Sequence, residues 1–520
     1  MPTRTVFISA LLIALGYALF TDRVWEDYLI TYKSSKNLVQ GHGLVFHPGE
    51  KVHTFTSPLG VLLPAACLVI APGGADDVAL WVFRLLSASA FAGAVALMFR
   101  LGTAAGYGSA SLLALACMTD AKSVDFSING METGFLLFFL AYMLWSLLKS
   151  EQKSWLHLGI AWGGLMWTRP DGVIYIAVLV LSTFLFSKHS GRSPVAWFRL
   201  FLQAGAVCTV IYLPWFITAW VYYGTPVPHT ITAKANAVGS LDFWGVVLTW
   251  LRVQTSILMP TTASEALFMP SANFLGGWPS WLPRVSASLS WIAAVAWVWR
   301  GFGWQMRALS FCLGLLLTYL TYFAGQAPAS WYLPGPTLIA LFILSGMLGQ
   351  LRYVSPRLTM TLTAMLLGLG TWMLIEVAAL SKVEQKLVDE GNRKVIGEWL
   401  RDNATPGDTM FMECLGYLGY YSGLKTYDFP GMSSPEVVAA SRKRKTIVWD
   451  ALIQELRPTW LVLRPIEADR IIRSTPQILT RDYEEIRVFD VSDQVQKLNV
   501  YGQGLLAFDS TFIIFRRVAP

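Results

Sequence analysis

The first 380 residues alternate apolar runs with short polar connections, and the last 140 residues do not. Nine runs are predominantly apolar and come close to the ~17 to 25 residues that a membrane-spanning helix needs. They cover residues 5–21, 79–99, 133–148, 171–187, 200–222, 285–299, 308–324, 333–350 and 359–380. With two shorter runs, 106–119 and 155–168, the pattern predicts a polytopic all-α membrane protein with about 11 transmembrane helices.

The run at 59–72 is assigned differently, because it is short for a bilayer. It follows Pro58 and contains Pro64, and its length suits an interfacial or re-entrant segment. If it does not cross, nearly every basic connection falls on the same side as Arg4. These connections contain Arg100, Lys149, Lys153, Lys188, Arg192, Arg199, Arg300, Arg307, Arg352 and Arg357. The positive-inside rule then predicts a cytoplasmic N-terminus and a C-terminus outside.

The N-terminal apolar stretch is expected to remain as the first helix. No small-residue cleavage site follows Phe20, so the stretch does not resemble a removable signal peptide. The topology then places most acidic residues of this half on the outer face. The outer segments are the loop 22–78 with its interfacial helices, the turns 120–132 and 169–171, and the connection 223–284.

Residues 381–520 differ in composition and contain no further apolar run of spanning length. Lys382 to Arg401 has the pattern of an amphipathic helix, and three short β-type runs follow it. These runs are Thr409 to Met412, Thr459 to Arg464 and Ser510 to Arg516. Strands separated by helical stretches predict a small extracytoplasmic α/β domain at residues 381–520, after a transmembrane domain at 1–380.

Composition and charge favour a membrane protein and argue against a nucleic-acid partner. Of the 520 residues 54% are hydrophobic and 14% charged, with a mean hydropathy of +0.48, whereas soluble domains are roughly 25% charged. The net charge of +7 comes from Lys and Arg between apolar runs, which is the positive-inside pattern. The five cysteines form no CxxC pair, so neither a disulfide framework nor a thiolate metal site is expected.

The first outer loop holds the residues best suited to chemistry. Glu26 and Asp27 open it, and later glycines and prolines shape it beside aromatic residues at the membrane surface. A carboxylate here can remove a proton from an acceptor hydroxyl as that oxygen attacks. The structural alternative is that both acids only begin an amphipathic helix, whose dipole favours them. The residues alone leave both interpretations open.

Two further outer turns carry charge. Glu132 ends an Asn-Gly-Met-Glu turn and is a second carboxylate at the outer face, able to bind an acceptor, hold a cation or only stabilise a helix start. Arg169 and Asp171 flank Pro170 in a tight reversal. For Asp171 the simple interpretation, an ion pair with Arg169, is preferred.

The fourth outer segment contributes His229 and Lys234 after a run of Tyr, Gly and Pro. Positive charge and hydrogen-bond donors at the membrane surface suit an anionic phosphate headgroup. Residues of these types are also common as plain solvated side chains, and their spacing does not decide between the two.

Metal binding is the weakest hypothesis. The first loop contains His42, His47 and His53 besides its acids, but no HxxxH or HExxH spacing, so a transition-metal site is not expected. A hard divalent cation such as Mg²⁺, Mn²⁺ or Ca²⁺ on Asp27 and Glu132 is easier to reconcile with the carboxylates.

Taken in order, these segments resemble one family, the GT-C glycosyltransferases, in the branch of the mycobacterial AftB arabinofuranosyltransferases and related polyprenyl-phosphate sugar transferases. The matching residues are Glu26 to Tyr32, Gly41 to Phe46, Pro48 to Val52, Thr56 to Leu59, Gly130 to Thr133, Arg169 to Gly172, Tyr223-Gly224 with Pro226, Pro228, Thr230 and Lys234, and more faintly Gly416 to Ser422, Tyr427-Asp428 and Gly431. The resemblance is strongest over the first 235 residues. One departure is Trp331 before Tyr332, where many relatives have an arginine that would contact phosphate.

The resemblance implies an enzyme of the bacterial cytoplasmic membrane, with its active site outside. It would transfer a sugar, arabinofuranose or another pentose or hexose, from a polyprenyl-phosphate carrier to an extracytoplasmic glycan, glycolipid or protein. Asp27 would be the general base, with inversion at the anomeric carbon. The implied donor-phosphate or substrate contacts are His229, Lys234, Arg169, Glu132, Glu26, Tyr28, His42 and Tyr332.

Two other functions compete with this one. A transporter or flippase of lipid-linked saccharides would also be polytopic, but paired repeats and charges buried within spans would be expected of it, and the sequence shows neither. A receptor or assembly subunit would use the membrane half as a scaffold, which gives no reason for carboxylates on three outer turns.

Overall fold

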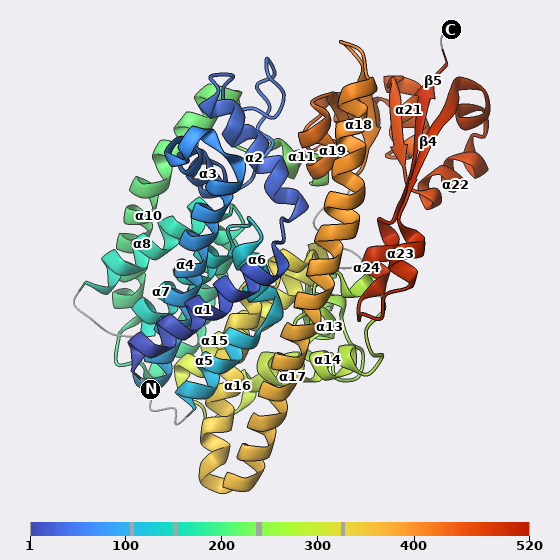
Figure 1. Cartoon of the computed structure of the whole chain (residues 1–520). Coiled ribbons are helices and arrows are strands. Elements are labelled where there is room, and N and C mark those ends of the chain that lie inside the picture. Colours follow the sequence, from blue (N-terminus) through green and yellow to red (C-terminus); the bar gives the residue numbers. More distant parts are fainter. Residues whose placement is uncertain (1, 105–108, 149–152, 236–241, 324–327, 519–520) are drawn as a thin grey trace.

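The computed structural model describes the chain except residues 1, 105–108, 149–152, 236–241, 324–327 and 519–520. A bundle of helices forms most of the molecule, and a smaller domain with a sheet lies at its upper right in Figure 1. This smaller domain, within residues 381–520, is called the outer domain after the side of the membrane that the sequence predicts for it. The bundle is built around one large apolar core that joins helices from both ends of the membrane half.

A helix coincides with each of the eleven predicted spans. These helices are α1 (Thr3–Thr21), α4 (Asp76–Ala104), α5 (Ala110–Thr119), α7 (Thr133–Leu148), α8 (Ser154–Thr168), α9 (Gly172–Phe186), α10 (Pro194–Tyr223), α14 (Leu282–Val295), α15 (Trp304–Phe323), α16 (Pro334–Val354) and α17 (Pro356–Val383). Among the described residues, six helices are long and apolar enough to cross a membrane: α1, α4, α10, α15, α16 and the rod that begins with α17. The number of spans stays a prediction.

The connections are more helical than the sequence predicted. They contain α2 (Glu26–Val39), α3 (Pro58–Ile70), α6 (Ala121–Ile128), α11 (His229–Ala235), α12 (Phe243–Gln254) and α13 (Thr262–Ala266), with 3₁₀ turns η1 (Pro72–Gly74), η2 (Ser187–His189), η3 (Asn273–Leu275), η4 (Ala296–Val298) and η5 (Ser330–Tyr332). Helix α3 has 13 residues, about 20 Å at 1.5 Å per residue, which is short of the ~30 Å hydrocarbon core. It lies beside α2 at the upper end of the bundle (Figure 1), as expected of an interfacial helix.

A continuous helical rod joins the two parts of the chain. Helix α17 continues through the π-helical η6 (Glu384–Lys394) into α18 (Val395–Asn403), and it runs from the bottom of the bundle to the outer domain (Figure 1). The amphipathic helix predicted from Lys382 is therefore the upper part of this rod. No loop separates the two domains at residue 380.

The outer domain is a five-stranded sheet with helices around it. Its strands are β1 (Thr409–Met412), β2 (Lys425–Asp428), β3 (Trp460–Leu463), β4 (Tyr483–Asp490) and β5 (Thr511–Arg517), in the order β2-β1-β3-β5-β4. Strand β1 pairs in parallel with β2 and β3, and β5 pairs antiparallel with β3 and β4. The helices are α19 (Leu415–Ser422), α20 (Pro435–Arg444), α21 (Trp449–Leu456), α22 (Pro465–Ser474), η7 (Ile478–Asp482), α23 (Ser492–Gln496) and α24 (Gln503–Phe508). The predicted α/β domain is confirmed.

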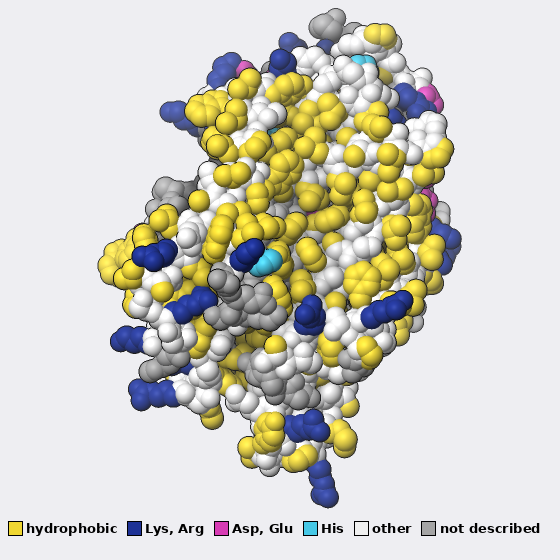
Figure 2. Space-filling model, turned by 90° about the vertical axis from the view of Figure 1, so that its left-hand side faces the viewer, with side chains coloured by type: hydrophobic (Ala, Val, Ile, Leu, Met, Phe, Trp, Pro, Cys, Tyr) yellow, Lys and Arg dark blue, Asp and Glu magenta, His cyan; other side chains and the backbone are white. Residues whose placement is uncertain are grey.

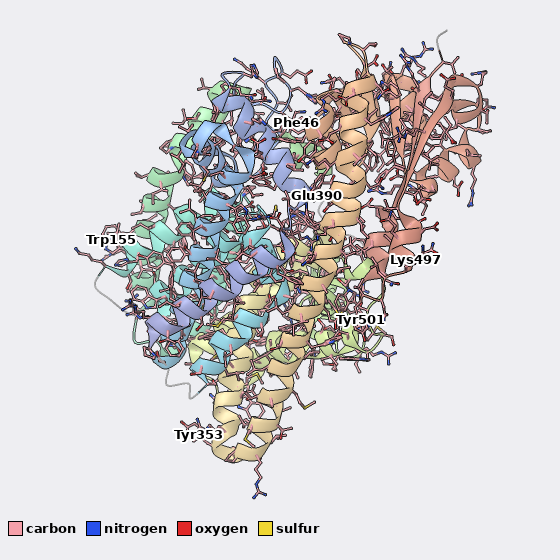
Figure 3. All side chains as sticks on the ribbon, in the orientation of Figure 1. Phe46, Trp155, Tyr353, Glu390, Lys497 and Tyr501 are labelled. Carbon is pink, nitrogen blue, oxygen red and sulfur yellow. The ribbon has the colours of Figure 1, made fainter. Side chains whose placement is uncertain are left out.

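The outer domain and the first outer loop share a core. Ile30 of α2 and Phe46 of the following loop belong to the same buried cluster as Met410, Trp460 and other residues of the sheet. Phe46 lies at the top of the molecule, between the loop and the outer domain (Figure 3). This packing fixes the position of α2 from above.

The surface separates apolar from basic side chains. Figure 2 shows a broad hydrophobic area across the middle of one face, with Lys and Arg side chains below it and others along the upper edge. The lower end also contains the N-terminus and the turn between α16 and α17, whereas α2, α3 and α11 lie at the upper end (Figure 1). Arg4 near the N-terminus and Arg352 and Arg357 at the turn between α16 and α17 therefore lie at the same end of the bundle.

Candidate active site

Asp27 lies in the first turn of α2. The helix begins at Glu26 after Trp25, which has an extended backbone and gives no side-chain cap. A carboxylate at this position is favoured by the partial positive charge of the helix N-terminus. The sequence-based prediction that Glu26 and Asp27 open a helix is confirmed, and it does not exclude a chemical role.

The Asp27 carboxylate is half-buried and has no fixed partner among the described residues. Burial raises the pKa of Asp27 above its ordinary 3.8, while the positive charges of Lys234 and Arg169 lower it and Glu413 raises it. Among the described residues, none forms a hydrogen bond or ion pair with this carboxylate. It is therefore a basic oxygen placed near two cations and free to accept a proton.

Arg169 is held on three sides. Its guanidinium lies 3.3 Å from Glu132 Oε1 and 2.9 Å from Asp171 Oδ1, and it stacks over the ring of Tyr332 at 4.5 Å. The exposed fraction of the Arg169 side chain is 6%. The predicted pair with Asp171 thus forms, and Glu132 and Tyr332 join the same group. These three contacts fix the orientation of the Arg169 guanidinium, so its positive charge stays directed at one place in the site.

Glu132 lies against the start of α3. Burial raises its pKa and Arg169 lowers it, with a smaller raising effect of Asp27, so the two carboxylates are electrostatic neighbours. A methyl group on Gly60 of α3 would lie 3.2 Å from Glu132 Oε2. This close approach places the start of the interfacial helix against the charged group.

His229 and Lys234 point to different partners, although both lie on α11. Lys234 is exposed and acts on Asp27. The His229 ring faces the outer domain, where burial lowers its pKa and Asp428 and a backbone hydrogen bond of Gly431 raise it. The His229 amide donates to the carbonyl of His53 at 2.8 Å. The structure therefore brings Lys234, and not His229, to the predicted base.

Glu26 is turned toward the outer domain. Its Oε1 accepts a hydrogen bond from the Gly416 amide at 3.1 Å, and its Oε2 lies 3.3 Å from Arg393 Nη1. Burial raises the pKa of Glu26 to about 7, against the opposing effect of Arg393. A Cβ on Gly416 would lie 2.3 Å from the Glu26 carbonyl oxygen. Glu26 thus fastens α2 to α19.

Tyr28 and His42 lie away from the carboxylate of Asp27. Tyr28 is buried and stacks on Tyr32 at 5.0 Å, on another face of α2. His42 is exposed in the loop after α2. Among the described residues, no hydrogen bond or ion pair joins either side chain to Asp27, Glu132 or Arg169.

The available donors fit a divalent cation poorly. No group of three or more His, Cys, Asp or Glu side chains within the described ranges is placed to hold a metal ion. Of the two carboxylates predicted as ligands, Glu132 is already paired with Arg169, and Asp27 faces two positive charges.

The sequence did not predict a buried charge network in the outer domain. Arg393 contacts Asp389 at 2.9 Å and also Asp509, and Arg464 contacts Asp509 at 2.6 Å and Glu467 at 2.6 Å. The amphipathic pattern of the rod was the one available signal, because it showed that one face is buried. It did not show that charges would lie on that face.

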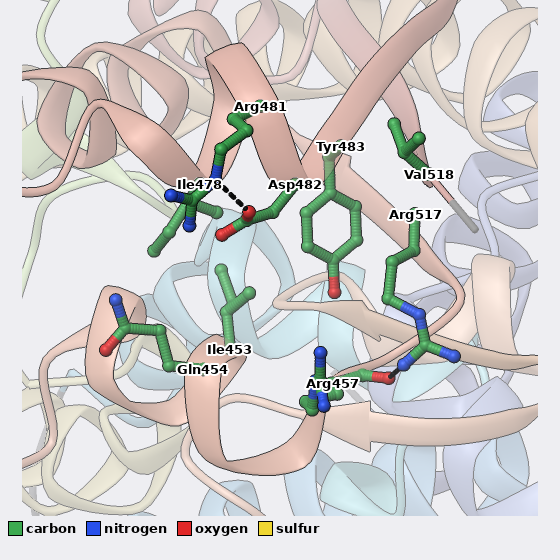
Figure 4. Close-up of a pocket in the computed structure, with 9 residues that line it drawn as sticks. All are labelled: Ile453, Gln454, Arg457, Ile478, Arg481, Asp482, Tyr483, Arg517 and Val518. Carbon is green, nitrogen blue, oxygen red and sulfur yellow. Dashed lines mark hydrogen bonds and ion pairs between the residues drawn. The ribbon is translucent and has the colours of Figure 1, made fainter. Parts of the chain in front are cut away.

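A hollow in the outer domain lies apart from these residues. It has a volume of about 500 Å³ and is lined by Arg457, Arg481, Arg517, Tyr483 and neighbours from α21, η7, β4 and β5 (Figure 4). None of the site residues predicted from the sequence lines it. We do not assign it to the active site.

The whole chain resembles solved membrane enzymes in its fold. ArnT from Cupriavidus metallidurans bound to undecaprenyl phosphate superposes with a TM-score of 0.51 at 13% identity, over 99% of this chain and 98% of that one. The oligosaccharyltransferase AglB from Archaeoglobus fulgidus, in complex with an inhibitory peptide and a dolichol-phosphate, gives 0.54 at 13% identity, over 88% and 69%. The chain has the GT-C fold.

Two curated proteins are similar to this chain in sequence, which is a more specific likeness than a shared fold. The chain is 30% identical over 257 residues to a terminal β-(1→2)-arabinofuranosyltransferase of Mycobacterium tuberculosis, over 46% of this chain. It is 27% identical over 286 residues to the enzyme of that name from Corynebacterium glutamicum, over 47% of this chain. The alignments cover 38% of each relative. Residues 381–508 match a family described as a domain of unknown function, DUF8728.

Proposed function

We propose that this GT-C chain is an inverting membrane glycosyltransferase that uses a polyprenyl-phosphate sugar as donor. The observation that carries the proposal is the Asp27 carboxylate, which is half-buried, free of a fixed partner among the described residues and placed near the positive charges of Arg169 and Lys234. A base beside cations is what transfer from an anionic carrier to a hydroxyl requires.

The chemical step is a single displacement. The acceptor oxygen attacks the anomeric carbon, its proton passes to Asp27, and the bond from that carbon to the phosphate oxygen breaks. One C–O bond forms as another breaks on the opposite face, so the configuration inverts. The raised pKa of Asp27 makes it a stronger base than an ordinary carboxylate.

Arg169 and Lys234 have separate parts in this proposal. Arg169 is fixed by Glu132, Asp171 and Tyr332, so it provides a rigid positive field for the charge that develops on the leaving phosphate. Lys234 is exposed and can follow the phosphate as it departs. His229, which faces Asp428, is assigned no contact with the phosphate in this proposal.

The comparisons support a lipid-linked donor in general terms. The solved relatives are bound to undecaprenyl phosphate and to dolichol-phosphate, and one also holds a peptide. The curated relatives are arabinofuranosyltransferases by name, so arabinofuranose is the first donor sugar to test. The acceptor is proposed to be an extracytoplasmic glycan, glycolipid or protein.

The proposed location is the bacterial cytoplasmic membrane. The basic side chains at the lower end of the bundle (Figure 2) support a cytoplasmic position for that end. Asp27, Arg169 and the outer domain would then face outside.

Two buried charges, Arg84 and Lys122, do not support the transporter hypothesis. Arg84 of α4 is held by Asp22 at 2.6 Å and by two carbonyls, and Lys122 of α6 donates to three carbonyls, including that of Leu267 at 2.8 Å. Charges fixed in this way stabilise the fold, and neither Arg84 nor Lys122 is free to bind a substrate.

The experiment is transfer by the purified protein from a panel of polyprenyl-phosphate sugars to a synthetic glycan acceptor. We expect one donor to be consumed, with arabinofuranose tested first, and a product whose new linkage is inverted relative to the donor by NMR. A retained configuration would contradict the single displacement. If no donor of the panel were consumed while the protein moved lipid-linked saccharides between leaflets of vesicles, the proposed function would be wrong.

A further inference from the structure

Residues 491–510 of the outer domain form an excursion from its sheet. They follow β4, contain α23 and α24, and return to the sheet at β5. The Val491 amide donates to the carbonyl of Ser510 at 2.9 Å, which closes the base of the excursion. In Figure 1, α23 and α24 lie below the sheet, and Figure 3 places Tyr501 lower than Lys497. The excursion therefore extends from the sheet toward the membrane half.

The excursion contacts the connection before α14 backbone to backbone. The Gly502 amide donates to the carbonyl of Gly277 at 2.9 Å. A Cβ on Gly277 would lie 2.7 Å from the backbone nitrogen of Gln503, and a Cβ on Gly504 would overlap the carbonyl oxygen of Leu275. Glycine is the residue that permits so close an approach. The position of the excursion against the membrane half is therefore fixed by these two backbones.

Four aromatic side chains meet where the excursion touches the bundle: Trp278, Trp281, Trp372 and Tyr501. We refer to them as the aromatic patch. The Tyr501 ring stacks on Trp278 at 5.8 Å and meets Trp372 edge-on at 5.4 Å. Trp281 stacks on Trp372 at 6.4 Å. Trp281 is 50% exposed and Tyr501 is 41% exposed, so the aromatic patch keeps open ring surface.

The position of Trp372 on α17 gives the depth of the aromatic patch. Arg357 lies at the lower end of α17, on the side predicted to be cytoplasmic. At 1.5 Å per residue, Trp372 lies about 22 Å above Arg357 along the helix axis. Leu380, which packs against the excursion, lies about 34 Å above it. The hydrocarbon core is ~30 Å thick, so a membrane-crossing α17 places the aromatic patch in the outer leaflet.

The aromatic patch continues the outward side of α17. Met360, Met365 and Ile375 are exposed, and at about 100° per residue they lie on the same broad side of the helix as Trp372. Exposed apolar surface of this extent marks a contact with a membrane or a protein. Trp and Tyr are enriched where acyl chains meet headgroups, because each combines an apolar ring with a polar N–H or O–H. The composition of the patch and its continuity with α17 favour the bilayer.

We propose that the 491–510 excursion is a lipid anchor, which inserts the Tyr501 side chain, with Trp281 and Trp372, into the outer leaflet of the membrane. The partner is the phospholipid bilayer, at the boundary between its acyl chains and its headgroups. This inference does not rest on the proposed function, because it requires only that α17 crosses the bilayer.

The anchor is joined to the helix that carries Asp27. Asp509 lies at the end of the excursion and pairs with Arg393. Arg393 in turn lies 3.3 Å from Glu26, at the start of α2. Lipid contact at Tyr501 therefore restrains the outer domain and, through these ion pairs, the start of α2.

The test is the depth of a fluorophore on the excursion, measured on the purified protein with one copy in each nanodisc. Tyr501→Cys carries a nitrobenzoxadiazole label, and the phospholipid is either unmodified or bears a nitroxide quencher on the upper part of its acyl chains. Of the five cysteines only Cys208 is not buried, and it is changed to Ser throughout. We expect the Tyr501 label to emit at shorter wavelength than in water and to lose emission in the nitroxide lipid.

Ile466→Cys is the matched control, because Ile466 is exposed on α22, which lies beside the sheet and above α24 in Figure 1. Its label should emit as in water and keep its emission in the nitroxide lipid. Asn499→Cys is a second label site, at an exposed residue of the same excursion, and it leaves the aromatic patch intact. Its label should lose emission when the nitroxide is on the lipid headgroup.

Two results would overturn the proposal. In the first, neither the Tyr501 label nor the Asn499 label loses more emission to nitroxide lipids than the Ile466 label does. In the second, the Tyr501 label emits at shorter wavelength but keeps its emission in the nitroxide lipid, which would mean that protein and not lipid covers this position. Sugar transfer is not measured in this test, so a failure of the proposed function would leave its outcome unchanged.

Discussion

Helix α2 separates two groups of buried charge that are built differently. On the side of Asp27 the charges are incompletely paired: Arg169 is fixed by Glu132 and Asp171, while the carboxylate of Asp27 has no partner among the described residues. On the side of Glu26 the charges are paired in a chain that runs through Arg393 into the outer domain.

The difference shows how one helical turn serves two purposes. A fully paired buried network holds geometry, since removal of one member leaves the others without a partner. An unpaired carboxylate near cations is unfavourable for stability and available for proton transfer. Glu26 and Asp27 are adjacent in sequence, and we propose a structural role for Glu26 and a chemical role for Asp27.

The largest expected effect is on catalysis at Asp27. Asp27→Asn keeps the side-chain shape and removes the base, so we expect the transfer rate to fall by about 10² to 10⁴ with little change in the thermal midpoint. The matched control is Asp493→Asn, an exposed aspartate that also lies in the first turn of a helix. Equal losses in the two variants would remove the distinction on which the comparison rests.

The next effect is on stability at Arg393. Its side chain is 7% exposed and contacts Glu26, Asp389 and Asp509. Arg393→Met should destabilise the outer domain by about 3 to 5 kcal/mol, because buried carboxylates lose their partner. Chemical denaturation followed by proteolysis of the outer domain measures this.

Arg401→Met serves as the control for Arg393→Met. Arg401 pairs with Asp402 at the surface, where the two side chains are 54% and 64% exposed, and such pairs contribute about 0 to 1 kcal/mol. A similar loss in both variants would mean that the network does not lock the outer domain.

A smaller effect concerns pH and Glu26. The pKa of Glu26 is raised from 4.5 to about 7 in the folded protein, so the folded state binds more protons than the unfolded chain between these values. Stability from this group therefore falls as the pH rises from 4.5 to 7. In Glu26→Gln this part of the pH dependence should disappear. Thermal midpoints at pH 5 and pH 8 check it, and an identical pH dependence in both proteins would refute it.

In the outer domain, the sequence predicted the buried central strands and missed the edge strands. The three predicted strands match β1, β3 and β5, which are the central strands of the sheet. The two that were missed, β2 and β4, are its edges. Edge strands bury less surface and carry more charge, so their apolar alternation is weak: β4 reads Tyr-Glu-Glu-Ile-Arg-Val-Phe-Asp and exposes most of its residues.

In the candidate site, too, some residues could be predicted from local sequence and others could not. Asp27, Glu132 and Arg169 were recognisable because outer turns between apolar runs carry few charges. Helix α6 was missed because its Lys, Ser and Asp residues suggest a loop, yet all eight of its residues are buried. The contacts between Glu26 and Arg393, and between Lys122 and Leu267, join distant parts of the chain, and no local pattern encodes them.

The pH dependence of transfer is the most direct test of Asp27 as the general base. Asp27 must be ionised to act as base, so kcat/KM should fall on the acid side, with a midpoint above the ordinary 3.8 of aspartate. Lys234 lowers the pKa of Asp27, and Lys234→Met should therefore move this acid limb to higher pH. Lys497→Met, at an exposed site of the outer domain, should leave it in place. An acid limb that stays fixed in Lys234→Met, or that persists in the residual activity of Asp27→Asn, would contradict the assignment of Asp27 as the base.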